Sequence, residues 1–94
     1  MISVSEIAKG ALLESLRESG VPPDQGLRLK VEQTGLVLET GSPTEQDRVI
    51  RHQGSTVIII NEELEEVIGD AIIDVAQKEE GPQLVFQRIS KNGH

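Results

Sequence analysis

The sequence predicts an α+β domain with mainly antiparallel or mixed β-sheets, one N-terminal helix and one short internal helix. Three observations support this prediction. Apolar residues recur at helical spacing near the N-terminus, later segments alternate apolar and polar residues with the period of a strand, and short polar bends separate those segments. Because such bends favour hairpins, and because a doubly wound parallel fold needs more helices, we expect segregated helices and hairpin connections.

The N-terminal part of the chain predicts a short extended segment at residues 1–4, followed by a helix that ends before Gly20. Ser3 and Glu6 have the spacing of a capping box, and Ser5 is a competing N-cap. Helical spacing places five apolar residues on the expected inward face: Ile7, Ala8, Ala11, Leu12 and Leu16.

Strands are predicted over six segments, namely residues 27–32, 36–40, 47–52, 56–60, 71–76 and 83–89. The run Thr56–Ile60 is apolar on both faces, so it should be a central strand. His52 is expected in a hairpin turn as a solvated surface residue, and the only aromatic residue, Phe86, is expected to pack in the core. A polar turn over residues 78–82 should join the last two strands.

The short internal helix carries the strongest charged feature of the chain. Asn61 is expected to cap it and Gly69 to end it, with Leu64, Val67 and Ile68 facing inward. Its four glutamates are suited to the positive N-terminal end of a helix and to a solvated face, but Glu62 and Glu66 also share a face that could hold a hard cation. We take the four as the candidate contact residues for a protein partner: Glu62, Glu63, Glu65 and Glu66.

Length and composition exclude several classes of function. Ninety-four residues are expected to form a single domain, 1–94, in which residues 90–94 form a flexible C-terminal tail. Sixteen acidic against nine basic residues give a net charge of −7, which argues against binding to nucleic acid, as does the single aromatic residue. Because no signal peptide or membrane span is recognisable, we expect a cytoplasmic protein without membrane contact.

The sequence offers little material for catalysis or for holding a cofactor. It has no cysteine, which excludes thiolate catalysis, zinc–thiolate sites and cysteine-ligated clusters. Only His52 and His94 are available as imidazole bases, and neither a nucleophile turn nor a phosphate-binding loop occurs. We therefore expect a protein that is not an enzyme, and we assign no catalytic, cofactor-binding or metal-binding residue.

Several segments occur in an order that is similar to that of a known family. The relevant runs are "ISVSEIAKGALLESL", "GLRLKVEQTG", "LVLETGSPTEQDRVI", "HQGSTVIIINEELEEVIGDAIIDV" and "GPQLVF". Together, from Ile2 to Phe86, they resemble the HesB-like, or A-type iron–sulfur carrier, family. The resemblance implies a HesB-like domain over residues 1–94, a role in iron–sulfur cluster assembly and a homodimer or larger assembly.

The sequence departs from the family at both places where the ligands are expected. The resemblance implies one cysteine in the bend after the Gly26-Leu27-Arg28-Leu29 strand, but Thr34-Gly35 runs directly into Leu36. It implies a Cys-Gly-Cys in the tail, where this chain has Asn92-Gly93-His94.

Iron–sulfur cores need thiolates, so we expect a non-catalytic protein-binding or regulatory module whose partner is an iron–sulfur assembly or target protein. The alternative is an iron-binding or iron-delivery protein that uses carboxylates together with His52 or His94.

Overall fold

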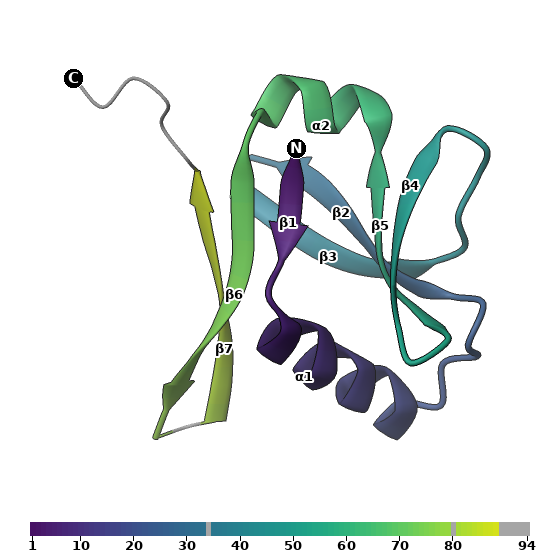
Figure 1. Ribbon diagram of the computed structural model, residues 1–94, viewed down its shortest axis with the longest axis vertical. Coiled ribbons are helices and arrows are strands. Elements are labelled where there is room, and N and C mark those ends of the chain that lie inside the picture. The colour runs from purple at the N-terminus through teal and green to yellow at the C-terminus, as the bar shows by residue number, and fades with distance from the viewer. Residues whose placement is uncertain (34, 80, 89–94) are drawn as a thin grey trace.

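The computed structural model describes residues 1–33, 35–79 and 81–88 of the chain. In this part of the chain seven strands form two sheets, and Figure 1 shows the two helices at opposite ends of the strands. In chain order the elements are β1 (Ile2–Val4), α1 (Glu6–Glu18), β2 (Gly26–Glu32), β3 (Gly35–Gly41), β4 (Asp47–His52), β5 (Ser55–Asn61), α2 (Glu62–Ile68), β6 (Ala71–Lys78) and β7 (Gly81–Arg88). The predicted α+β class with mixed and antiparallel sheets is confirmed.

The four-stranded sheet has the order β3-β2-β5-β4 and contributes the largest share of the buried apolar residues. β2 pairs antiparallel with β3 and parallel with β5, while β4 and β5 form an antiparallel hairpin. All residues from Thr56 to Ile60 are buried, as their apolar run predicted, because β5 has a strand on each side and both helices pack against it.

The three-stranded sheet has the order β1-β6-β7. β1 pairs parallel with β6, and β6 pairs antiparallel with β7 over the whole of both strands. The hairpin is longer than the sequence predicted, since β6 continues to Lys78 and β7 begins at Gly81. Phe86 packs against the core from β7, and the predicted tail over 90–94 lies outside the described residues.

Helix α1 is capped by Ser5, which the structure selects over the capping box of Ser3 and Glu6. The Ser5 hydroxyl accepts the Ala8 N–H at 3.1 Å and donates to the Asp74 carboxylate at 2.7 Å, so the cap also joins the helix to β6. That hydroxyl and the Val75 N–H hold the pKa of Asp74 below its ordinary value.

The inward face of α1 differs from the prediction at two residues. Ala8, Leu12 and Leu16 are buried as expected, and Leu13 joins them, but Ile7 is 67% exposed. The apolar stripe is therefore rotated towards Leu13, because the helix packs mainly against β5 and β6.

An ion pair that the sequence did not suggest connects β2 to the start of β4. The Arg28 guanidinium donates to both Asp47 carboxylate oxygens, at 3.0 and 2.9 Å, and to the Ser42 carbonyl at 2.7 Å. The same carboxylate accepts the Thr44 N–H at 2.7 Å and the Thr44 hydroxyl at 3.0 Å, and its side chain is fully buried. These bonds hold the loop between β3 and β4 against the sheet.

Candidate functional site

The candidate site is the short acidic helix α2 together with the strand ends that hold it. The Asn61 side chain caps the helix, accepting the N–H groups of Glu63 at 2.9 Å and Leu64 at 3.4 Å. Leu64 and Ile68 pack against the core, as predicted. The prediction that Val67 faces inward is wrong: its side chain is 77% exposed because α2 contacts the core along one narrow face only.

The four glutamates of α2 separate into two kinds. Glu62, Glu63 and Glu66 are exposed, whereas the Glu65 side chain is only 15% exposed. Two shallow depressions flank the helix, one of about 380 Å³ next to Met1 and Arg48 and one of about 270 Å³ next to Gln46 and Asn61. Glu62 and Glu66 line both of them, so this pair lies at the centre of the exposed acidic surface.

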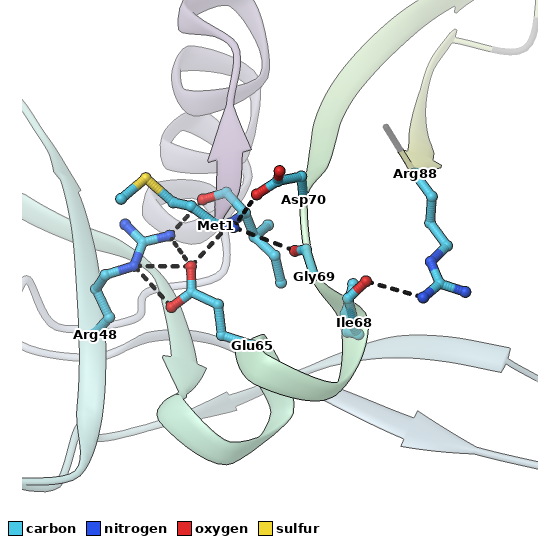
Figure 2. Close-up of polar contacts among 8 residues, drawn as sticks. Met1, Arg48, Glu65, Ile68, Gly69, Asp70 and Arg88 are labelled. Atoms are coloured by element: carbon cyan, nitrogen blue, oxygen red, sulfur yellow. Dashed lines mark hydrogen bonds and ion pairs between the residues drawn. The ribbon is translucent and has the colours of Figure 1, made fainter. Parts of the chain in front are cut away.

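Glu65 is held within the protein by Arg48 of β4, as Figure 2 shows. Arg48 Nε lies 3.0 and 3.1 Å from the two carboxylate oxygens, and Arg48 Nη2 lies 2.7 Å from one of them. That oxygen also accepts the Ile2 N–H at 2.8 Å, while the Arg48 guanidinium donates to the Ile2 carbonyl. Arg48 and the Ile2 N–H lower the pKa of Glu65, so this side chain anchors α2 to β1 and β4.

Two further cationic groups hold the C-terminal end of α2 (Figure 2). The Met1 ammonium lies 2.5 Å from the Asp70 carboxylate and 3.4 Å from the Gly69 carbonyl. The Arg88 guanidinium, from the end of β7, donates to the Ile68 carbonyl at 3.0 Å. Strands β1, β4 and β7 therefore all contribute to the position of the acidic helix.

The other predicted site residues lie away from α2. His52 ends β4 and is only 22% exposed, so the prediction of a solvated turn residue is wrong. Its Nδ1 lies 3.7 Å from the Glu6 carboxylate, because β4 runs under α1. The turn itself is Gln53-Gly54, with φ angles of 53° and 80°.

The places where the family resemblance implies ligands hold no cluster of metal-binding side chains in the described part of the chain. Glu32 and Gln33 are exposed at the end of β2, while Thr34 and His94 fall outside the described residues. Among residues 1–33, 35–79 and 81–88, no three histidine, aspartate or glutamate side chains are grouped closely enough to hold a metal ion. The sequence itself supplies no thiolate, so its residues do not fit an iron–sulfur cluster.

Sequence reasoning identified the acidic residues of this site but not the groups that position them. Arg48 is one of several basic residues in an alternating strand, and nothing near it in the sequence indicates Glu65, 17 residues later, as its partner. Asp70 contacts the Met1 ammonium, which lies 69 residues earlier in the chain. Neither contact can be recognised from residues that are close together in the sequence.

Within the described residues, no helix has the length and apolar character needed to cross a membrane. No family model matches the sequence, and no curated protein matches it significantly.

Solved structures do match this chain closely. Escherichia coli SufA, described as involved in the biosynthesis of iron–sulfur clusters, is 21% identical with a TM-score of 0.73, over 93% of this chain and 84% of that one. IscA, solved with a [2Fe-2S] cluster, is 20% identical with a TM-score of 0.62, over 94% and 85% of the two chains. The predicted resemblance is thereby confirmed for the fold: this chain without cysteines has the HesB-like fold of the A-type iron–sulfur carriers SufA and IscA.

Proposed function

We propose that this protein acts in iron–sulfur cluster biogenesis as a non-catalytic protein-binding or regulatory module in the cytoplasm. It docks to an assembly or target protein without ligating a cluster through its own residues. The whole chain acts as one HesB-like domain in this proposal.

One observation carries the proposal: a fold shared with SufA and IscA is combined with a complete lack of cysteine. An iron–sulfur core binds soft thiolate ligands, and carboxylates or a single imidazole do not replace them. The shared fold extends over 93% of this chain, so the feature that is retained is its shape. A retained shape without the ligands favours recognition by other proteins over transport of a cluster.

The surface that we propose for the partner is formed by Glu62, Glu63 and Glu66. These three carboxylates are exposed, whereas Glu65 supports the helix from beneath through its ion pair with Arg48. A concentrated negative surface attracts a basic surface and accelerates its association. Because Val67 is exposed on the same short helix, it can add an apolar contact to the proposed interface.

Affinity purification with quantitative mass spectrometry tests the proposal. The bait is the tagged protein, compared with the double variant Glu62→Lys and Glu66→Lys. The matched control is Glu14→Lys with Glu18→Lys, which makes the same charge change at the same i, i+4 spacing on the exposed face of α1. We expect an iron–sulfur assembly or target protein to be recovered by the wild type and the control, and recovery to fall about tenfold with the α2 variant.

Recovery of no protein of iron–sulfur metabolism would contradict the proposal, and equal loss in both double variants would contradict the proposed surface.

Anaerobic calorimetric titration with ferrous iron tests the alternative of iron delivery. Stoichiometric uptake at micromolar iron would favour that alternative over a module that only binds protein.

A further inference from the structure

We propose that the pocket between α1 and the turn after β4 is a binding site for a small zwitterion of the α-amino acid type. Figure 1 shows the β4–β5 turn and the C-terminal half of α1 at the same end of the molecule, opposite to α2. The pocket has a volume of about 260 Å³. It is lined by Gly10, Leu13, Glu14, Arg17, His52 and Gln53.

Two opposite charges in this pocket are not used by the fold. Glu14 and Arg17 have the i, i+3 spacing at which ion pairs form on a helix, and Glu6 and Lys9 form such a pair at 3.5 Å in the first turns of α1. Within the described part of the chain, however, the side chains of Glu14 and Arg17 make neither an ion pair nor a hydrogen bond. Both charges are therefore available to a ligand.

His52 presents one ring nitrogen to the same pocket. Its Nδ1 lies 3.7 Å from the Glu6 carboxylate, and a Cβ added at Gly10 would lie 3.9 Å from its Nε2. A carboxylate beside Nδ1 favours the neutral tautomer with the proton on that nitrogen, which leaves Nε2 as a hydrogen-bond acceptor. A ligand ammonium is a donor that suits this acceptor and the Glu14 carboxylate together.

Two residues of the pocket are unfavourable for the fold. Gly10 lies inside α1, where alanine is the better residue, although its φ is not positive and an added Cβ would make only an ordinary contact. Gln53 has a φ of 53°, which asparagine or glycine tolerates better. Residues that lower stability and gather at one pocket are typical of binding sites, where stability is given up for function.

The lining selects a ligand that carries both charges. The Arg17 guanidinium and the Gln53 amide can donate to a carboxylate, while Glu14 and His52 Nε2 can accept from an ammonium. A simple anion or a simple cation would meet a like charge as well as an opposite one. Because the volume is below the roughly 300 Å³ at which pockets for drug-sized ligands begin, the ligand is small, and buried Leu13 offers its side chain an apolar contact.

Heteronuclear NMR of the ¹⁵N-labelled protein tests the site with three probes at constant ionic strength, namely L-alanine, acetate and ethylammonium. We expect L-alanine to shift the amide signals of the lining residues with a Kd of roughly 1–10 mM, because a small ligand makes few contacts. Acetate and ethylammonium each carry one of the two charges, so each should bind at least about fivefold more weakly. No saturable shift with L-alanine, shifts confined to residues elsewhere, or equal affinity for acetate or ethylammonium would overturn the proposal.

Charge variants locate the binding on the pocket. Arg17→Gln and Glu14→Gln should each weaken L-alanine binding about fivefold, since each removes one charged contact. The matched controls are Arg51→Gln and Glu18→Gln, at exposed residues of the same charges that do not line the pocket, and these should keep the wild-type Kd. Equal losses in the lining and control variants would show an effect of overall charge and would overturn the site.

Gly10→Ala and Gln53→Asn separate binding from stability. We expect both to stabilise the fold, but the first places a methyl group near His52 Nε2 and the second shortens the side chain that carries the amide. Each should raise the Kd about threefold in a protein that unfolds at a higher urea concentration, a combination that loss of structure does not produce. An unchanged Kd in both variants would overturn the proposal. This inference does not rest on the proposed function, because capture of a protein partner by α2 does not involve this pocket.

Discussion

Replacing Asp47 by asparagine removes the carboxylate that joins β2 to the start of β4 and to the loop before it. The carboxylate accepts four hydrogen bonds, two from Arg28 and two from Thr44, at 2.7 to 3.0 Å. An asparagine of the same shape offers one oxygen, and its NH₂ group then faces donors. The substitution therefore leaves Arg28 partly buried without its counter-charge.

The size of the effect follows from the burial of the two partners. Breaking a buried ion pair by removing one partner costs about 3–5 kcal/mol. The Asp47 side chain is fully buried, but Arg28 remains 24% exposed and keeps its bond to the Ser42 carbonyl. We therefore expect Asp47→Asn to lower the free energy of unfolding at pH 7 by about 2–3 kcal/mol.

The same pair makes stability depend on pH in a defined direction. Arg28 and Thr44 lower the pKa of Asp47 from its ordinary 3.8 to about 2. That change corresponds to about 2.4 kcal/mol, which solvent screening at the exposed part of Arg28 reduces to about 1–2 kcal/mol. Because the folded-state pKa is the lower one, this stabilisation is present above pH 4 and is lost as the pH falls towards 2.

Urea unfolding followed by far-ultraviolet circular dichroism measures both effects, and it suits a chain without tryptophan or tyrosine. We expect the difference between wild type and Asp47→Asn to shrink from pH 5 to pH 2, while Asp24→Asn, at an exposed turn aspartate, stays within about 0.5 kcal/mol of the wild type. A double-mutant cycle with Arg28→Gln should give a coupling energy of about 1–2 kcal/mol. The reasoning is refuted if Asp47→Asn unfolds at the wild-type urea concentration, or if the difference is constant with pH.

Four further substitutions, and one control, are checked by the same unfolding assay. Gly10→Ala should raise stability by about 0.5–1 kcal/mol, because the new Cβ lies 3.9 Å from His52 Nε2, an ordinary contact, and alanine favours the helix. Gly26→Ala should lower it by about 1–3 kcal/mol, since its Cβ would lie 2.9 Å from the Val57 carbonyl oxygen. Gln53→Asn should raise it by about 0.5 kcal/mol, because asparagine tolerates the φ of 53° better than glutamine does. Glu65→Gln should lower the stability by about 1–3 kcal/mol. The control Glu66→Gln, at an exposed residue, should change the stability little. A larger loss with Glu66→Gln than with Glu65→Gln, or a loss of stability with Gly10→Ala, would contradict the structure.

Much of the fold could be predicted because it depends on local patterns. The helical spacing after Ser5, the alternation along β2 and β3 and the apolar run of β5 are properties of neighbouring residues, and each predicted its element. The same patterns do not determine which apolar side chains of an element are buried in the core. Ile7 and Val67 fit an apolar helical face in the sequence, yet both are exposed because each helix contacts the core along a different face.

The candidate site was predictable only in part. Four glutamates in one short helix are visible in the sequence, but nothing local distinguishes Glu65 from its neighbours. Its separate role depends on Arg48 and on the Ile2 N–H, which are far away along the chain.

The sequence by itself determined the absence of thiolates, the acidic charge and the order of helices and strands, since these depend on composition and on spacing between near neighbours. Only the tertiary structure decided which charges are paired: Arg28 with Asp47, and Arg48 with Glu65. It also decided which strands stand at the edges of the two sheets, because an edge exists only once the strands have been placed in order. The physical reason is that ion pairs and neighbouring strands form between groups that are close in space, whether or not those groups are close in the chain.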